Sequence, residues 1–211
     1  MRSTPKTIQP PRSTELDTPA KERIVEKATI LFTMYGVTVA TMMIAHFAHT
    51  NVETIKKYFG TRERLVFDFL KSILKQAEQS WREIELEHPN DPEAQLRTWV
   101  YHAQFAADLS DQEVHAQLSR AAVDLIGIED TNPLLREIER FWQNERRRTV
   151  KLCEKAQFRD PAGLADKLLL LVRGARNERN CYGYGGPSRM IAEAGDDLMV
   201  AHGAQRKPVL D

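Results

Sequence analysis

Cysteine, long apolar runs and an excess of charge of either sign are all scarce in this sequence. The 211 residues include only two cysteines, Cys153 and Cys181, and neither stands in a CxxC or Cys/His spacing, so no disulfide framework and no zinc site is expected. The longest aliphatic run, 168–172, is far shorter than the ~20 residues that cross a bilayer, and the first residues lack the apolar run of a signal peptide. We therefore expect a cytoplasmic protein with no membrane partner, metal or cofactor.

The formal net charge is zero, from 30 basic and 30 acidic side chains, but the charge is unevenly distributed. Residues 1–75 hold 12 basic and 7 acidic side chains, a net charge of +5, whereas residues 76–211 hold 18 basic and 23 acidic side chains, a net charge of −5. Such asymmetry suggests a polyanionic partner for the basic part.

Helix signals recur from Thr18 onward. Thr18-Pro19, Asp91-Pro92, Asn132-Pro133 and Asp160-Pro161 each pair a capping residue with a proline, which is typical of a helix start. Between these starts the apolar residues have helical spacing, and no stretch shows the sustained alternation of a strand. The sequence predicts an all-α protein of about nine helices, over 19–35, 41–48, 52–58, 62–87, 92–109, 112–127, 133–157, 161–181 and 187–202.

Residues 41–59 have the pattern of two short helices joined by a tight turn at His49-Thr50. Asn51 can cap the second helix by accepting a hydrogen bond from one of its free backbone N–H groups. The residues expected to face inward are Ile44, Ala45, Ala48, Ile55 and Phe59, and those left on the outer face are Val52, Thr54, Lys56 and Lys57. This arrangement predicts a helix-turn-helix, whose second helix enters the major groove of DNA.

With these residues the chain resembles the tetracycline-repressor-type (TetR) family of bacterial regulators. The family pattern is roughly F-x-x-x-G, a short loop, then T-x-x-x-I-A-x-x-A-G-V-S-x-G-T-x-Y-x-x-F-x-S-K-E-x-L. The matching positions are Phe32, Gly36, Ile44, Ala45, Ala48, Thr54 and Phe59, with Asn51 at the capping serine and Thr61, Arg62, Glu63 and Leu65 at S-K-E-x-L. His49 and Glu53 depart from the pattern because they stand at glycine positions, Lys56 replaces the tyrosine, and the loop before Ile44 is one residue short.

The resemblance implies a homodimer that binds a double-stranded, palindromic DNA operator and is released from it by a small-molecule effector, as a repressor does. Lys56 and Lys57 are expected to contact phosphates, and Val52 and Thr54 base edges. Glu53 either accepts a hydrogen bond from a cytosine N4 or is solvated at the groove edge. The expected DNA-binding residues are Thr41, Asn51, Val52, Glu53, Thr54, Lys56, Lys57 and Tyr58.

Two of these residues have alternative interpretations. Thr41 either donates to a phosphate or serves as the N-cap of its helix. Tyr58 either donates to a phosphate through its hydroxyl or packs against the first helix.

The same resemblance implies that the last two helices form the dimer surface, through an apolar stripe of Leu164, Leu168, Leu171, Ile191 and Leu198. A ligand cavity is expected within 62–157, and the residues expected to line it are Trp99, His102, Phe105 and Trp142. Each of these is open to the alternative of ordinary core or surface packing. The acidic charge of this part mildly favours a neutral or cationic ligand.

The chain is expected to consist of three parts: a disordered N-terminal arm over 1–17, a helix-turn-helix DNA-binding domain over 18–62, and an effector-binding and dimerisation domain over 63–211. The sequence contains no nucleophile elbow, phosphate loop or Glu-x-x-His pair, so an enzyme is not expected. An alternative to the regulator is a helical interaction module that kept the scaffold and lost DNA readout, because Glu53, Lys56 and the short loop all depart from the family pattern.

Overall fold

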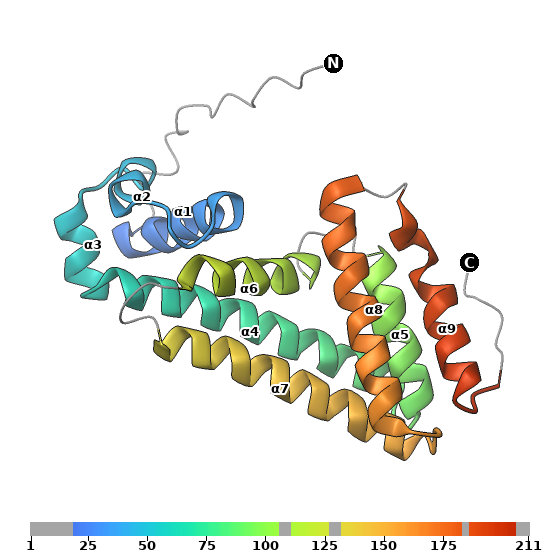
Figure 1. The fold of residues 1–211 in the computed structure, drawn as a ribbon. Coiled ribbons are helices and arrows are strands. Elements are labelled where there is room, and N and C mark those ends of the chain that lie inside the picture. The colour runs from blue at the N-terminus through green and yellow to red at the C-terminus, as the bar shows by residue number, and fades with distance from the viewer. Residues whose placement is uncertain (1–18, 106–110, 127–131, 183–185, 206–211) are drawn as a thin grey trace. The chain divides into compact units, whose positions relative to one another are not determined.

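The computed structural model describes residues 19–105, 111–126, 132–182 and 186–205, and the predicted arm over 1–17 lies outside them. Every regular element within these ranges is helical, so the predicted all-α class is confirmed (Figure 1). The elements are α1 (Ala20–Tyr35), α2 (Thr41–Phe47), α3 (Val52–Phe59), α4 (Arg62–Glu87), α5 (Pro92–Phe105), α6 (Asp111–Leu125), α7 (Asn132–Lys155), α8 (Pro161–Tyr182), the 3-10 turn η3 (Pro187–Met190) and α9 (Ile191–Ala201). None of the helices in the described ranges is both long enough and apolar enough to cross a membrane.

The chain divides into two compact units, residues 1–69 and 70–211. The division falls inside α4, later than the boundary expected between 62 and 63. The first turns of α4 carry the buried side chains of Leu65, Val66 and Phe69, and the ring of Phe69 packs on that of Phe32 in α1 with 5.1 Å between centroids. The start of α4 is therefore part of the first unit's core.

The core of the first unit begins with one stripe on α1. Ile24, Ala28, Leu31 and Phe32 are buried there, at the spacing that puts side chains on one face of a helix. Gly36 ends the helix with a φ of 85° and donates its N–H to the carbonyl of Phe32 at 2.9 Å. That left-handed φ favours glycine.

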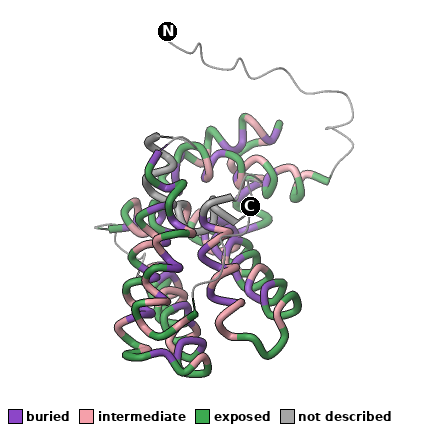
Figure 2. The backbone as a smooth tube through the Cα atoms, turned by 90° about the vertical axis from the view of Figure 1, so that its right-hand side faces the viewer, coloured by how far each residue is buried: buried purple, intermediate pink, exposed green. Residues whose placement is uncertain are grey.

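The second unit has its core where α5, α7, α8 and α9 pack against one another. Buried and exposed residues alternate with helical period along the described parts of these helices, and Figure 2 shows buried and exposed stretches alternating along the backbone. Cys153 lies fully buried in this core, and burial raises the pKa of its thiol to about 12. A thiol of this kind stays protonated and acts as a small apolar side chain.

Part of the predicted dimer stripe belongs to this core. Leu164, Leu168 and Ile191 are buried within the single chain, so they have no surface to offer a second copy and their assignment to a dimer surface needs correction. Leu171 and Leu198 are only partly buried. Within 161–175 of α8, where exposure is described, the most exposed large apolar residue is Leu170, with 72 % of its surface accessible.

Several ion pairs connect helices of the second unit, and two of them differ in burial. Arg97 of α5 pairs with the buried Asp196 of α9, and Arg146 of α7 donates two hydrogen bonds to Asp166 of α8 at 2.6 and 2.9 Å. The hydrogen bond from Arg146 holds the pKa of Asp166 below its usual value. Of the two, the buried pair is the one whose disruption should matter to stability, because removing a partner leaves an uncompensated buried charge.

We predict that Gly195→Ala destabilises the second unit by about 1–3 kcal/mol through overpacking. A Cβ at this position in α9 would lie 2.6 Å from Cγ1 of Val100 in α5, and this clash outweighs the gain of about 1 kcal/mol in helix propensity. The measurement is the free energy of unfolding in urea. In a Val100→Ala background the same substitution should cost less; an equal cost in both backgrounds would contradict this close approach.

Candidate functional site

The turn between α2 and α3 is closed by backbone and side-chain hydrogen bonds. The Thr50 N–H donates to the carbonyl of Ala45 at 2.9 Å. The Asn51 side-chain oxygen accepts from both the N–H and the hydroxyl of Thr54, at 2.8 and 3.0 Å. The capping role predicted for Asn51 is thus confirmed, and it satisfies one of the donors left free at the start of α3.

The inner face of α3 is fixed by two buried side chains. Ile55 and Phe59 are only 1 % and 7 % exposed. Ile44 and Ala45 are buried on α2, which packs on α3. Because residues three or four apart share one face of a helix, the other residues of α3 turn outward. Those with exposed side chains are Glu53, Lys56, Lys57 and Tyr58, and those of intermediate exposure are Val52 and Thr54.

The charges on the outer face of α3 are not equivalent. Glu53 and Lys56 form an ion pair with 3.2 Å between Oε1 and Nζ. Lys57 is exposed and makes no hydrogen bond or ion pair within the described part of the chain. Lys57 is therefore the cation of α3 that is free to meet a phosphate, whereas Lys56 carries a carboxylate beside its ammonium group.

The structure removes the N-cap role of Thr41 and shows that Tyr58 is partly exposed. Ala40 occupies the N-cap of α2 without a side-chain cap, so Thr41 begins the helix and its hydroxyl does not cap it. Tyr58 is 44 % exposed and lies with Lys21 and Arg64 around a shallow hollow of the first unit. Both hydroxyl-bearing side chains thus keep accessible surface.

Arg62 is a positioning residue that sequence reasoning did not assign. Its guanidinium donates to the carbonyls of Val37 and Val39, the latter at 3.0 Å, and burial lowers its pKa. It therefore ties the start of α4 to the short loop that leads into α2. The resemblance aligned Arg62 with the K of S-K-E-x-L, but no spacing signal indicates that its side chain turns toward carbonyls 23 and 25 residues earlier.

We predict that His49→Gly raises the free energy of unfolding by about 0.5–1 kcal/mol. His49 has a φ of 50°, which a side chain with a Cβ adopts at a cost of about 1 kcal/mol and glycine adopts readily. The control is His46→Gly inside α2, which should lower the same free energy by about 1 kcal/mol. Chemical denaturation measures both, and a loss of stability in both variants would contradict the prediction.

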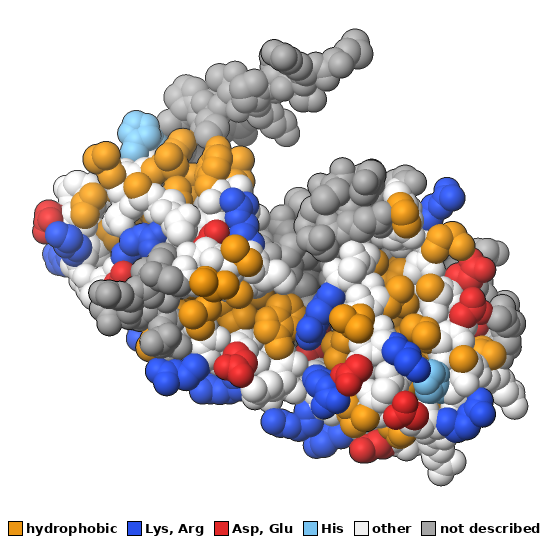
Figure 3. Space-filling view, viewed as in Figure 1, with side chains coloured by type: hydrophobic (Ala, Val, Ile, Leu, Met, Phe, Trp, Pro, Cys, Tyr) orange, Lys and Arg blue, Asp and Glu red, His pale blue; other side chains and the backbone are white. Residues whose placement is uncertain are grey.

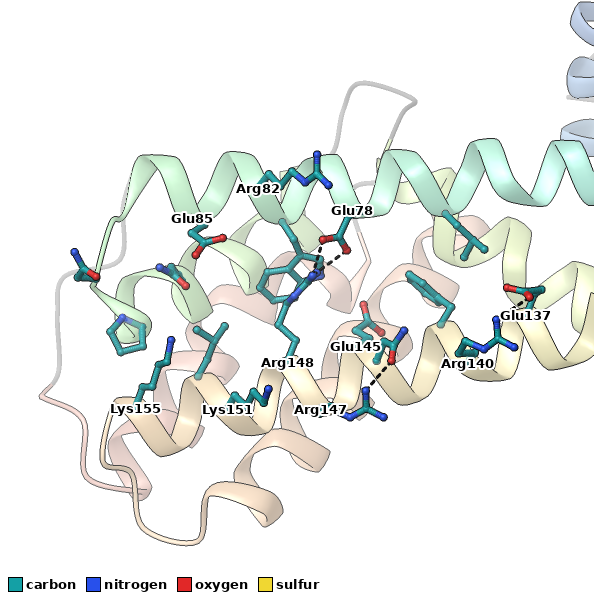
Figure 4. A pocket seen from close by; sticks show the side chains of 18 residues that line it. Glu78, Arg82, Glu85, Glu137, Arg140, Glu145, Arg147, Arg148, Lys151 and Lys155 are labelled. Atoms are coloured by element: carbon teal, nitrogen blue, oxygen red, sulfur yellow. Dashed lines mark hydrogen bonds and ion pairs between the residues drawn. The ribbon is translucent and has the colours of Figure 1, made fainter.

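The second unit contains a groove between α4 and α7, with a volume of about 730 Å³ (Figure 4). Arg148 reaches across it from α7 and donates to both carboxylate oxygens of Glu78 on α4, at 2.7 and 2.8 Å. The same guanidinium lies over the ring of Trp81, 5.3 Å from its centroid, so it bridges the two walls. The other lining residues are Leu74, Arg82, Glu85, Asn90, Pro92, Gln95, Glu137, Arg140, Phe141, Asn144, Glu145, Arg147, Lys151, Leu152 and Lys155.

Two of the residues predicted to bind a ligand, Trp99 and Trp142, pack behind aromatic residues of the groove and are not among its described lining residues. Trp99 is buried and stacks on Trp81 with 5.4 Å between centroids. Trp142 packs against Phe141 and under the guanidinium of Arg173, which is 4.4 Å from its ring.

His102 is of intermediate exposure outside the groove lining, and the side chain of Phe105 lies outside the described residues. Their role in ligand binding stays a prediction. Across the described ranges, no group of three His, Cys, Asp or Glu side chains is arranged to hold a metal ion.

No family model matches the chain, and no curated protein matches it in sequence. Solved structures do match. A TetR-family transcriptional regulator from Streptomyces coelicolor aligns with a TM-score of 0.69 at 14 % identity, over 88 % of this chain and 96 % of its own. A TetR regulator from Haloarcula marismortui aligns with a TM-score of 0.63 at 18 % identity, over 87 % and 97 %. A transcriptional regulator from Saccharomonospora viridis, in complex with choline, aligns with a TM-score of 0.69 at 21 % identity, over 87 % and 96 %.

These matches extend over most of the chain at low sequence identity, so they define its fold. Helices α1 to α3 supply a capped helix-turn-helix, and the later helices supply a separate bundle with a groove. The chain has the fold of the TetR-type transcriptional regulators.

Proposed function

We propose that this chain is a ligand-responsive transcriptional regulator, rather than an enzyme, that binds a palindromic DNA operator as a homodimer in the cytoplasm. The observation that carries the proposal is the outer face of α3, where a capped, amphipathic helix presents Lys57, the Glu53–Lys56 pair and Tyr58 to solvent. A helix of this size fits the major groove. The net charge of +5 over residues 1–75 adds a general attraction for phosphates.

A homodimer is supported by surface that the single chain leaves uncovered on α8. Leu170 is largely exposed, and a Cβ added at Gly174, one turn later, would meet nothing within 4 Å among the described residues. A mid-helix glycine costs about 1 kcal/mol relative to alanine, and no neighbour in the described ranges requires this one. A glycine at this position would allow the α8 helix of a second copy to approach closely. Leu171 and Leu198 supply adjoining apolar surface.

Operator binding is tested by selection of genomic fragments on the purified protein, followed by anisotropy titration of the enriched duplex. We expect a palindromic motif, because each copy of a two-fold dimer reads one half-site. The Lys56→Ala/Lys57→Ala variant should bind this duplex at least about tenfold more weakly, since each lost phosphate or base contact is worth about 1–3 kcal/mol.

The matched control is Lys75→Ala/Arg136→Ala, which removes the same charge from exposed positions of the second unit outside the groove and should bind DNA as the wild type does. Enrichment of no motif would reject the regulator. It would favour the helical interaction module, the alternative suggested by the carboxylate of Glu53 beside Lys56.

The Glu53–Lys56 pair is suited to reading one base pair. An ammonium donor beside a carboxylate acceptor complements the major-groove edge of G·C, where guanine O6 and N7 accept and cytosine N4 donates. We infer that Lys56 donates to the guanine and Glu53 accepts from the cytosine. This assigns Lys56 to a base edge and leaves phosphate binding on α3 to Lys57.

We predict that Glu53→Ala relaxes specificity at one position of each half-site. In the wild type, replacing that G·C pair by A·T should weaken binding about tenfold or more, and in Glu53→Ala this penalty should largely disappear. The Lys57→Ala variant should instead weaken binding evenly across sequences. Titrating both duplexes against all three proteins measures the penalties. A penalty unchanged in Glu53→Ala would leave Glu53 as a solvated residue of the groove edge.

Effector release is the remaining part of the proposal. The groove between α4 and α7 has the size of a small-molecule site. The Saccharomonospora viridis neighbour, which has the same fold, is in complex with choline, and this supports a small-molecule ligand for this chain as well. A ligand that binds the DNA-free conformation of the dimer more tightly than the DNA-bound conformation would weaken operator binding. The loss of DNA affinity is set by the difference between the ligand's affinities for these two conformations.

A further inference from the structure

The groove between α4 and α7 has a local charge opposite to that of the unit that contains it. Residues 76–211 carry a net charge of −5, yet the groove is lined by six basic and four acidic side chains, a net charge of +2. Most of the basic groups come from α7, and Figure 3 shows Lys and Arg side chains following the side of the unit that α7 forms.

Much of the acidic charge in the groove is already paired. Glu78 binds Arg148 through both oxygens, and Glu137 accepts from Arg140 at 2.8 Å. Glu145 is buried and lies 3.5 Å from the guanidinium of Arg173, which comes from α8.

Three cations remain uncommitted. Lys151, Lys155 and Arg82 make no hydrogen bond or ion pair within the part of the chain that the structure describes. Glu85 is the one acidic lining residue with the same status there. The unpaired charge of the groove is therefore positive, and Figure 4 shows Lys155 extending from α7 into the space between the two helices.

The groove also has an aromatic and aliphatic wall. Trp81 and Phe141 line it together with Leu74 and Leu152, and Trp81 is held in place by stacking on the buried Trp99. Trp99 and the guanidinium of Arg148 cover the two faces of the Trp81 ring, so the surface that it offers the groove is its edge. An apolar body can pack on this edge and on Leu152, while an anionic group at its end meets the lysines. The volume of about 730 Å³ is within the range of about 300–1,000 Å³ for small-molecule sites.

We propose that this groove binds a small amphipathic organic anion. Its aromatic or aliphatic body packs on the edge of Trp81 and on Leu152, and its carboxylate, sulfonate or phosphate is held by Lys151 and Lys155 through charge-assisted hydrogen bonds. The inference rests on the proposed function in taking the groove as the effector site. It reverses the expectation of a neutral or cationic ligand, because that expectation used the net charge of the whole part and the groove has the opposite sign.

The test uses two dyes that differ in charge and share their rings, 1-anilinonaphthalene-8-sulfonate and the neutral N-phenyl-1-naphthylamine. Fluorescence titration of the full-length protein, without DNA, should give an affinity for the anionic dye at least about tenfold above that for the neutral dye. In Lys151→Ala/Lys155→Ala the affinity for the anionic dye should fall about tenfold or more. The neutral dye should bind this variant as it binds the wild type.

The charge-matched control is Lys75→Ala/Arg136→Ala, which removes two exposed cations of α4 and α7 outside the groove lining and should leave both affinities unchanged. Choline chloride should displace the anionic dye no more than sodium chloride at equal ionic strength. Equal affinities for the two dyes, anionic-dye binding that survives Lys151→Ala/Lys155→Ala, or displacement specific to choline would overturn the proposal. So would an anionic dye that fails to bind at about 1 mM. Since no DNA is present, these outcomes are independent of whether the chain binds an operator.

Discussion

Burial of Ile55 and Phe59 is the constraint on which the candidate DNA-binding surface depends. These two side chains fix the rotation of α3 about its own axis, because they are the ones that pack inward beside α2. Once they are buried, helical geometry leaves Glu53, Lys56 and Lys57 no direction but outward. Asn51 caps α3 and so determines where the helix begins. Both the first residue and the orientation of α3 are therefore set by contacts that involve no DNA.

In both units the charge near the candidate site differs from the net charge of the unit. The net charge of the chain is zero, and even the division into +5 and −5 is too coarse to describe either site. On α3, Lys56 is neutralised by Glu53 while Lys57 is not. In the acidic second unit, a groove with more basic than acidic lining residues lies between α4 and α7. Charge–charge interactions weaken over about one Debye length, ~8 Å at physiological salt, so a ligand responds to neighbouring side chains and hardly to the total.

The sequence predicted the parts of the molecule that depend on local signals. Asp91 and Asp160, each before a proline, cap α5 and α8 as expected, whereas at α1 Pro19 itself occupies the N-cap position. Apolar spacing identified the inner face of α3. These signals follow from hydrogen bonds and periodicity within a few residues. Non-local contacts were not predictable in this way. The attachment of Arg62 to Val37 and Val39, and the bridge from Arg148 to Glu78, join residues 23 to 70 positions apart.

The apolar stripe predicted to form the dimer surface also depended on contacts that are distant in the sequence. An apolar row on α8 is equally compatible with a partner chain and with the protein's own core. The packing of α5, α7 and α9 against α8 assigns Leu164 and Leu168 to the core. In the groove, Trp81 and Phe141 line the wall whereas Trp99, chosen from its helical face, stacks behind Trp81. A helical face indicates that residues lie together, but it does not say on which side of the neighbouring aromatic ring they lie.

The central claim is that the outer surface of the helix-turn-helix is where this protein meets DNA. Hydrogen–deuterium exchange of the full-length protein, with and without the selected duplex, tests it without any substitution. We expect added DNA to slow exchange chiefly in peptides that cover 41–59, with a smaller effect where dimer contacts tighten on α8 and α9. Slowed exchange confined to peptides from 70–211, with 41–59 unchanged, would contradict it.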